Sequence, residues 1–282
     1  MPVTLKDIRI AANEVDLSYR PICVHSSLRS FGIVEGGAST VISGLKQVGC
    51  TILVPTCPPW DTYLVKPRPH QLLDQNGGSA TAWQTYFDSL PDPEPDSIPV
   101  YDAKIAPVDK DMGAIPAAVV ANPAHIRGQH PLFPFAALGP LAEKLIVMQT
   151  AVNVFAPLKQ LAEDDGFVVL MGVDLTRATI LHLAEELAGR TLFRRWVSNA
   201  DGEPMAVAVG GCSEGFENLA PALHSIEQIC YVGKSKWRLY SARQLLDQVI
   251  PIIQAEPRLT HCVDSACDRC NDALLGGPIL HH

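Results

Sequence analysis

The stretch PICVHSSLRSFGIVEGGASTVISGLKQVGCTILVP, residues 21–55, decides the fold. It begins with an apolar run at 21–25, which is typical of a buried strand. A helix-like segment follows over 36–49, and the β-branched run 51–54 is a second strand. Strand, helix and strand at this spacing predict a βαβ unit with parallel strands.

The carboxyl ends of these two strands, at His25 and at residues 55–57, are expected to open onto the same edge of the sheet. Ligands of open α/β sheets bind at that edge. The run 167–171 is the most strand-like of the chain, and a helix over about 178–188 follows it. We therefore predict an α/β fold over residues 1–282, as a single three-layer α/β/α domain with a central mixed, largely parallel sheet.

Two segments stand apart from this pattern. Residues 58–102 are rich in proline and acid, so they form a long excursion with a short helix at 81–90. An excursion of this size is either a functional loop, such as a lid, or a solvated insertion. Between this excursion and the chain end, we expect a strand at 205–209 and a helix near 242–253. Residues 255–282 then form a cysteine-containing C-terminal cap.

The composition limits the partners. Acidic residues outnumber basic ones by 30 to 22, giving a net charge of −8. A nucleic-acid partner is therefore not expected, because binding phosphates needs clustered Lys and Arg. No apolar run is long enough for a membrane span, and the N-terminus lacks the order of a signal peptide. We expect a cytoplasmic protein with mostly reduced thiols and no membrane contact. The sequence leaves the oligomeric state open.

The helix after residue 178 carries the clearest candidate chemistry. Thr179, His182 and Glu185 recur every three residues, which places them on one side of the helix. An imidazole at the ligand edge of the sheet can take a proton from an incoming amine. A carboxylate such as Glu185 can orient that ring. From spacing alone, an ordinary solvated polar face remains the alternative.

The chain resembles the aminoglycoside 3-N-acetyltransferase family in five blocks, which occur in the family's order and cover about residues 20–270. The blocks are residues 24–32 with 36–38; Pro55 and Thr56; residues 107–116; Arg127 with residues 130–131 and 135–140; and residues 170–173 with Thr179, His182, Ala184 and Glu185. One such block is weak evidence, whereas five in order are strong.

The resemblance implies an enzyme that transfers an acetyl group from acetyl-CoA to the 3-amino group of a 2-deoxystreptamine aminoglycoside. It implies a ternary complex and direct transfer, with His182 as the general base. Glu185, Asp174 and Thr179 complete the expected catalytic set.

The resemblance also assigns binding residues. The residues expected to bind the coenzyme are His25, Ser26, Ser27, Leu28, Arg29, Ser30, Arg127, His130, Phe135 and Ala136. Small hydroxyl residues at a strand end expose backbone N–H groups and leave room for a ligand. For His130, a loop-capping role is the alternative to a place near the thioester. A polycationic acceptor suits the acids Asp61, Asp102 and Glu185, together with those of the excursion at Asp92, Glu94 and Asp96.

The sequence departs from the family pattern at two positions, which leaves open the identity of the amine acceptor and of the carboxylate that partners His182. Pro134 stands where many members have Ser, and Thr176 stands where many have Asp. Both Glu185 and Asp174 are therefore candidate partners of His182. A CoA-binding relative that acts on another amine, or that no longer acetylates, is the alternative function.

Cysteines suggest two further sites. Cys267 and Cys270 form a CxxC five residues after Cys262, and zinc would need a fourth ligand from His261 or Cys212. Zinc is compatible with this spacing but is not expected, because reduced thiols in the cap are the default.

At the sheet edge, Cys57 could pair with His25 or His182 as a nucleophile. Such a pair would make the protein a thioester hydrolase or a transferase with a covalent intermediate.

Overall fold

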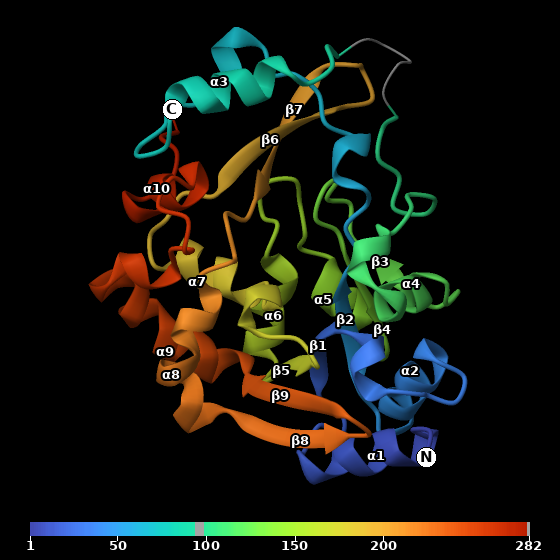
Figure 1. The fold of residues 1–282 in the computed structure, drawn as a ribbon. Helices are drawn as coiled ribbons and strands as arrows, with labels where there is room; N and C mark the ends of the chain where they lie inside the picture. The colour runs from blue at the N-terminus through green and yellow to red at the C-terminus, as the bar shows by residue number, and fades with distance from the viewer. Residues whose placement is uncertain (94–98, 281–282) are drawn as a thin grey trace.

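Seven strands form one central sheet in the order β3-β4-β2-β1-β5-β9-β8 (Figure 1), in a computed structural model that describes residues 1–93 and 99–280. The bounds are β1 Pro21–Ser26, β2 Thr51–Pro55, β3 Ile126–Arg127, β4 Phe135–Leu138, β5 Phe167–Met171, β8 Gln228–Val232 and β9 Ser235–Ser241. Strands β2, β1 and β5 are parallel, and the outer strands pair antiparallel. The predicted mixed α/β sheet is thus present.

The parallel core places three strand ends at one edge. Ile22 pairs with Ile52 of β2 on one side and with Phe167 of β5 on the other. Strands β1, β2 and β5 therefore end together, at Ser26, Pro55 and Met171. The predicted βαβ unit and the shared edge at which its strands end are confirmed.

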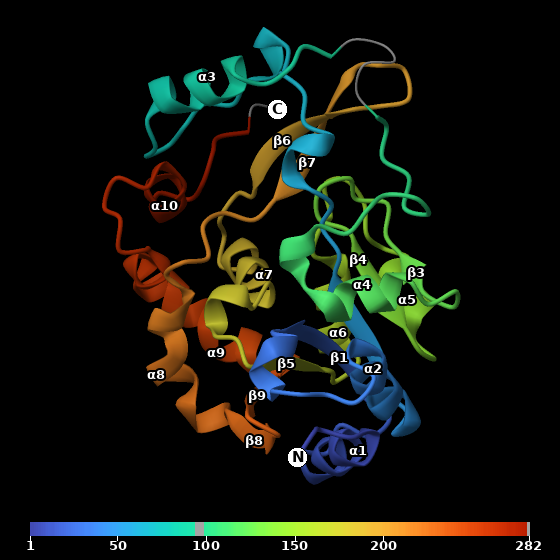
Figure 2. The same ribbon diagram turned by 45° about the vertical axis from the view of Figure 1, so that its right-hand side comes forward.

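Helices cover both faces of the sheet, which gives the predicted three layers (Figures 1 and 2). Successive residues of β1 point to opposite faces, with Ile22 and Val24 in one apolar core and Cys23 in the other. Burial on both faces explains why this strand reads as an unbroken apolar run. One layer holds α1 Leu5–Glu14, α2 Ala38–Gln47 and α4 Ala114–Val120, and the other holds α5 Ala142–Ile146, α6 Ala156–Glu163, α7 Ile180–Leu187 and α9 Ala242–Ala255.

Helix α7 is the helix that was predicted over 178–188. A 3-10 turn at Leu175–Arg177 precedes it, and Asp174 caps that turn by accepting a hydrogen bond from the Thr176 N–H. Gly189 follows the helix with φ of 105°, a conformation that favours glycine at a helix end. Other 3-10 turns lie at Leu28–Phe31, Trp60–Thr62, Pro69–Gln71, Lys110–Met112, Phe216–Leu219, His224–Ile226 and Pro257–Thr260.

The described part of the excursion over residues 58–102 packs on a separate two-stranded hairpin. This hairpin is β6 Phe193–Ser198 and β7 Pro204–Val209, and the excursion's helix is α3 Ala80–Asp88 (Figure 2). Trp83 and Phe87 of α3 pack against the hairpin, and the Phe87 ring meets Trp196 edge-on at 5.2 Å. The described part of the excursion is therefore folded on its own apolar core rather than solvated. Glu94 and Asp96 lie outside the described residues.

Helix α10, Asp268–Leu274, ties the C-terminal cap to the excursion. The fully buried Asp272 carboxylate accepts hydrogen bonds from the backbone N–H groups of Asn76, Gly77 and Gly78 at 2.7–2.9 Å. Its second oxygen accepts one from the Trp83 indole at 3.1 Å. A buried carboxylate with four donors fixes the cap against α3, because losing the acceptor would leave those donors unpaired. Helix α8, Ala220–Leu223, packs on α9.

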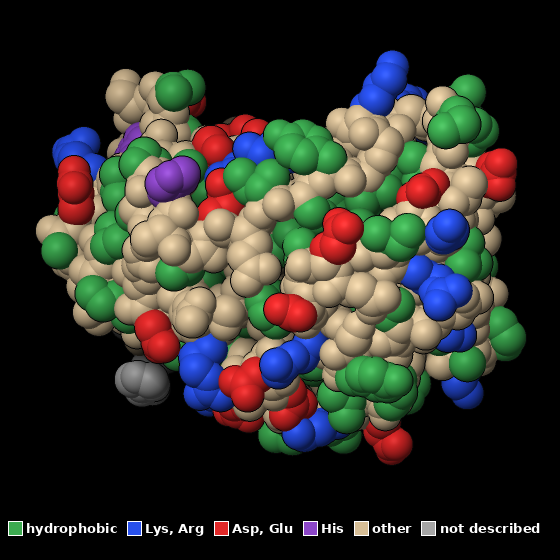
Figure 3. Space-filling view, turned by 90° about the horizontal axis from the view of Figure 1, so that it is seen from below, with side chains coloured by type: hydrophobic (Ala, Val, Ile, Leu, Met, Phe, Trp, Pro, Cys, Tyr) green, Lys and Arg blue, Asp and Glu red, His purple; other side chains and the backbone are tan. Residues whose placement is uncertain are grey.

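Side chains of both charge signs lie on the surface. On the face seen in Figure 3, Lys and Arg side chains are interspersed with Asp and Glu, and apolar side chains are scattered among them. Among the described residues, no helix has the length and apolar character needed to cross a membrane.

Candidate active site

A cavity of about 1140 Å³ lies at the carboxyl edge of the parallel strands. Its walls include His25 and Ser26 at the end of β1, Pro55 at the end of β2, and Thr179 and His182 on the β5–α7 side. The hairpin and the cap contribute the opposite wall. Drug-sized ligands occupy roughly 300–1,000 Å³, so this cavity has room for two small molecules at once.

His182 is held by a buried charge network at this cavity. Its Nδ1 lies 2.9 Å from Oε2 of Glu185, one turn further along α7. The other oxygen of Glu185 accepts a hydrogen bond from Arg190, which also donates to Thr260 Oγ1 at 2.7 Å and to the Pro257 carbonyl at 2.8 Å. His182, Glu185 and Arg190 are each at most 8% exposed. The network therefore fixes both the position of the ring and the location of the negative charge beside it.

Packing sets the plane of the His182 ring. The ring stacks on Phe155, with an interplanar angle of 13°, and meets Phe216 edge-on at 4.8 Å. Gly210 closes the third side, where an added Cβ would lie 2.6 Å from the imidazole Cδ2. Within the described part of the chain, no hydrogen bond uses the ring's Nε2. In the neutral tautomer whose Nδ1–H donates to Glu185, Nε2 carries a free lone pair in the cavity wall.

The loop after β1 was predicted to bind the coenzyme, and most of it lines the cavity. His25, Ser26, Ser27, Leu28 and Arg29 are all part of the wall. Burial lowers the pKa of His25 to about 4, with a smaller contribution from the charge of Arg177, so this ring is neutral at pH 7.

Ser30 differs from the rest of its loop. Its hydroxyl donates to the Ser27 carbonyl and shares a second hydrogen bond with the Ser235 hydroxyl, each at 2.7 Å. Gly172 lies so close that an added Cβ there would be 2.0 Å from Ser30 Oγ. Ser30 therefore braces the loop against β5 and β9 rather than lining the cavity.

Four other residues predicted to bind the coenzyme do not line the cavity. Phe135 and Ala136 point into the two apolar cores from β4. Arg127 is buried and donates to Thr56 Oγ1 at 3.0 Å and to the carbonyl oxygens of Thr56, Ala106 and Pro107. It joins the ends of the excursion to the sheet, which is a structural role that the linear spacing did not indicate.

His130, the fourth, caps its own loop, as the alternative interpretation held. Its Nε2 donates to the Ala208 carbonyl at 2.9 Å, and its Nδ1 accepts from the backbone N–H groups of Leu132 and Phe133. The ring is fully buried, and this burial lowers its pKa to about 4. The neutral ring thus joins the loop before β4 to the hairpin strand β7.

Acidification is expected to destabilise the fold through His130. Its pKa is about 4 in the folded chain against an ordinary 6.5, so between these values the unfolded chain binds more protons. Stability present above pH 6.5 is therefore lost as the pH falls toward 4, by about 2 kcal/mol between pH 7 and 5 for this one group. Denaturant unfolding at both pH values, with wild type and His130→Asn, measures this contribution. Equal acid losses in the two proteins would contradict it.

The expected carboxylates do not all lie where they were predicted. Of the two candidate partners of His182, Glu185 contacts the ring, whereas Asp174 is exposed and bonded to Thr176. Asp61 and Asp102 do not line the cavity; Asp102 accepts a hydrogen bond from the Lys104 N–H at 2.8 Å instead. Thr179 does line it, and its carbonyl accepts from the His182 N–H.

The charge of the cavity was not anticipated. The five cationic lining residues are Arg29, Lys110, Arg177, Arg195 and Arg269, and Asp111 is the lining carboxylate among the described residues. Arg29 and Arg177 lie in the turns after β1 and β5 and Lys110 lies in the turn before α4, while Arg195 comes from β6 and Arg269 from α10. Arg195 is held between Trp83 and Tyr86, with its guanidinium carbon 4.8 and 5.1 Å from the ring centres. Arg195 lies on a different element from His182 and Arg269 is 87 residues away, so no spacing within one helix or strand could indicate them.

Cys57 lines the cavity but lacks the properties of a nucleophile. Burial raises the pKa of its thiol to about 12, and the partly offsetting charge of Arg127 does not reverse this. The thiolate, not the thiol, attacks carbonyl carbons. Among the described residues, no hydrogen bond joins Cys57 to a histidine.

Replacing Cys57 by serine is expected to leave kcat near the wild-type value, with a change of about 0.5 kcal/mol, or roughly twofold. Steady-state turnover measures this directly. A drop of about 10³-fold or more would instead support covalent catalysis through this residue.

Comparison with known proteins agrees with this geometry. Residues 23–254 match the family model described as aminoglycoside 3-N-acetyltransferase. Aminoglycoside N(3)-acetyltransferase IX of Micromonospora chalcea is 32% identical over 198 residues, and the match covers 66% of this chain and 63% of that protein. The corresponding enzyme VII of Streptomyces paromomycinus is 27% identical, with 80% and 82% covered.

Solved structures share the fold. The apoenzyme of aminoglycoside acetyltransferase AAC(3)-IVa superposes with a TM-score of 0.73 at 23% identity, covering 97% of both chains. The YokD protein of Bacillus subtilis gives the same TM-score and identity, covering 91% of this chain and 95% of that one. The family model spans most of the sequence, and these neighbours share its architecture. The chain therefore belongs to the aminoglycoside 3-N-acetyltransferase family.

Proposed function

We propose that this protein transfers the acetyl group of acetyl-CoA directly to a primary amine, with His182 as general base and the 3-amino group of a 2-deoxystreptamine aminoglycoside as acceptor. The observation that carries the proposal is the cavity-lining imidazole, whose Nδ1–H is held by Glu185 while Nε2 has no protein partner among the described residues. This is the arrangement a base needs to accept a proton from a bound amine.

In the proposed reaction, the amine nitrogen attacks the thioester carbonyl carbon, forming the C–N bond. His182 Nε2 takes the proton from this nitrogen, and Glu185 stabilises the imidazolium that results. The C–S bond then breaks, and CoA leaves as a thiolate that recovers the proton from His182 or from solvent. Arg190 holds the Glu185 carboxylate in place through a charge-assisted hydrogen bond. No protein nucleophile takes part, in keeping with the protonated state of Cys57.

Acetyl-CoA is the co-substrate, and its phosphates suit the cations at the strand ends. Arg29, Lys110 and Arg177 come from the loops after β1, near α4 and before α7, so three positive groups converge on the edge where ligands bind in such sheets. Guanidinium groups match phosphate oxygens in charge and geometry. A neighbouring structure, that of AAC-IIIb, is a binary complex with CoASH, at a TM-score of 0.70 and 20% identity.

The aminoglycoside assignment rests on the family. Structures of AAC(3)-IVa with a histidine-to-alanine change are complexes with a gentamicin or with apramycin. In this chain the cavity lining does not have the acidic character that a polycation favours, since it includes Arg195 and Arg269. That observation favours a second candidate, an amine that also carries a carboxylate or phosphate, which these arginines would bind.

A panel assay tests both candidates. The protein is mixed with acetyl-CoA and either 2-deoxystreptamine aminoglycosides or amines bearing one anionic group, and a thiol reagent follows free CoA. The first proposal expects thiol release with an aminoglycoside and a product heavier by one acetyl group. Release confined to the anionic amines, with a raised KM in Arg269→Gln, would replace the aminoglycoside by the second candidate. If no amine of the panel causes thiol release while acetyl-CoA still binds, the transferase proposal is refuted.

A further inference from the structure

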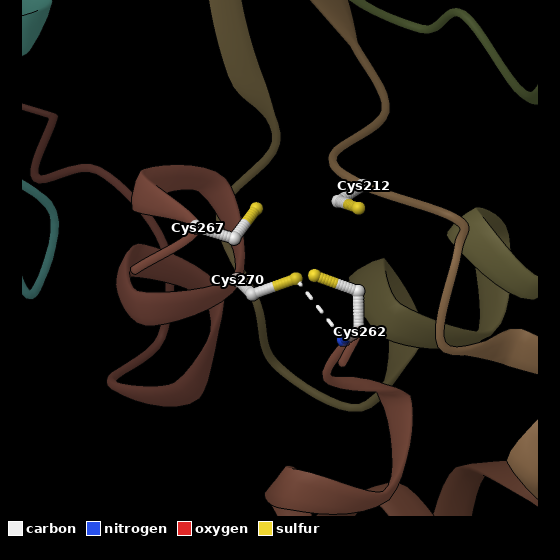
Figure 4. Close-up of side chains that lie close together, drawn as sticks. All are labelled: Cys212, Cys262, Cys267 and Cys270. Carbon is white, nitrogen blue, oxygen red and sulfur yellow. Dashed lines mark hydrogen bonds between the residues drawn. The ribbon is translucent and has the colours of Figure 1, made fainter. Parts of the chain in front are cut away.

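Four cysteines gather beside the active site. Cys212 lies in the loop after β7, Cys262 follows the 3-10 turn Pro257–Thr260, and Cys267 and Cys270 open and continue α10. Their sulfur atoms all lie within 4.8 Å of one another, and Figure 4 shows the Cys262 and Cys270 sulfurs facing each other, with the Cys212 and Cys267 side chains beside them. We propose that these four side chains bind one zinc ion as a closed, tetrahedral Cys₄ site.

The sulfur geometry suits this ion. In a tetrahedral site with Zn–S bonds of about 2.3 Å, sulfur atoms are roughly 3.8 Å apart, so small side-chain rotations bring the four atoms into place. All eight cysteines of the chain are free thiols in the structure. Four thiolates with no open position make a structural site rather than a catalytic one.

The structure also decides the fourth ligand. His261 was an alternative, but its Nδ1 contacts the Cys262 carbonyl at 2.7 Å and its Nε2 contacts Asn271 Oδ1 at 3.2 Å. Both ring nitrogens are therefore engaged elsewhere. Cys212, about fifty residues before the other three, completes the set because the hairpin loop returns to α10. The sequence analysis expected reduced thiols without a metal, and this proposal replaces that expectation.

The surroundings favour a thiolate cluster. The backbone N–H of Cys262 points at the Cys270 sulfur at 3.5 Å, a contact typical of metal-bound cysteine (Figure 4). A zinc ion with four thiolates carries two negative charges. Arg269, inside the CxxC, lines a small cavity together with Cys212 and Cys270 and supplies a compensating positive charge.

The site would fix one wall of the active site. Two residues before Cys212, Gly210 lies against the His182 ring, and Arg269 of the same cluster lines the main cavity. Glu185, the partner of His182, shares a small cavity with Cys212, Cys270 and Arg269. Zinc here joins the hairpin loop to the C-terminal cap directly behind the catalytic network, and so acts by positioning.

Metal analysis of the purified full chain tests the proposal without any activity assay. We expect about one zinc per chain in protein prepared under reducing conditions, and strongly reduced zinc in Cys212→Ser and Cys270→Ser. Cys230→Ser is the matched control, because Cys230 is a half-buried free cysteine outside the cluster, and it should keep the metal. The zinc-free variants should also melt at lower temperature than Cys230→Ser.

A second measurement covers variants that fail to fold. Replacing zinc by Co²⁺ in the wild-type protein should give the visible bands of tetrahedral cobalt and strong thiolate charge-transfer absorption, which added zinc removes. Absence of both bands and of bound zinc would overturn the site, as would iron in its place, disulfides among the four cysteines, or zinc retained in both serine variants. None of these outcomes depends on whether the protein acetylates an amine.

Discussion

Replacing His182 by alanine is expected to lower kcat by about 10²–10⁴-fold, the usual cost of removing a general base. The amine must lose its proton as the C–N bond forms, and Nε2 of His182 is the acceptor that the proposed mechanism uses. Acetyl-CoA affinity should change little, because the residues proposed to hold its phosphates, Arg29, Lys110 and Arg177, are untouched. Steady-state kinetics and a binding titration on the same preparation measure both quantities.

The matched control is His224→Ala, which removes an exposed histidine remote from the cavity wall. It should turn over like the wild type. Since His182 is buried between Phe155 and Phe216, the melting temperature of His182→Ala must also be checked. A folded His182→Ala protein with wild-type kcat would remove this residue from the mechanism.

Changing Glu185 to glutamine should affect both rate and stability. The amide keeps the shape but loses the charge that stabilises the imidazolium, and neutralising the equivalent carboxylate in a catalytic triad costs up to about 10⁴-fold. Arg190, 8% exposed, would lose its buried counter-charge. Breaking a buried pair from one side costs about 3–5 kcal/mol, so the free energy of unfolding should fall by a similar amount.

A double variant separates these two effects. In Glu185→Gln with Arg190→Met, no buried cation is left unpaired, so much of the lost stability should return. The rate should stay low, because the imidazolium still lacks its carboxylate. Recovery of kcat together with stability would mean that Glu185 serves the fold alone, and the proposed dyad would be wrong.

The parallel core could be predicted from sequence because its signals are local. Residues 21–25 and 167–171 form unbroken apolar runs, which strands buried on both faces require. The three-residue spacing of His182 and Glu185 likewise indicated their contact, since neighbours at that spacing share a helix face.

The remainder of the site depends on contacts between distant segments. Arg127 and His130 belong to a block that resembles the family. Both side chains, however, form hydrogen bonds with backbone groups that come near only in the folded chain. Arg190 reaches Glu185 and Thr260 through a similar long-range contact. Cys212 joins Cys270 because the hairpin returns to the cap. Composition likewise indicated an acidic protein, while the cavity itself gathers cations.

The most direct test of the central claim, direct transfer at the His182 cavity, uses acetyl-CoA labelled in the acetyl group. Wild-type protein is mixed with it, with and without an amine from the panel that acts as acceptor, and the label is followed on protein and amine. The account predicts that label passes to the amine as fast as CoA is released, and that the protein stays unlabelled. Release of CoA without the amine, with label bound covalently to the protein, would contradict it.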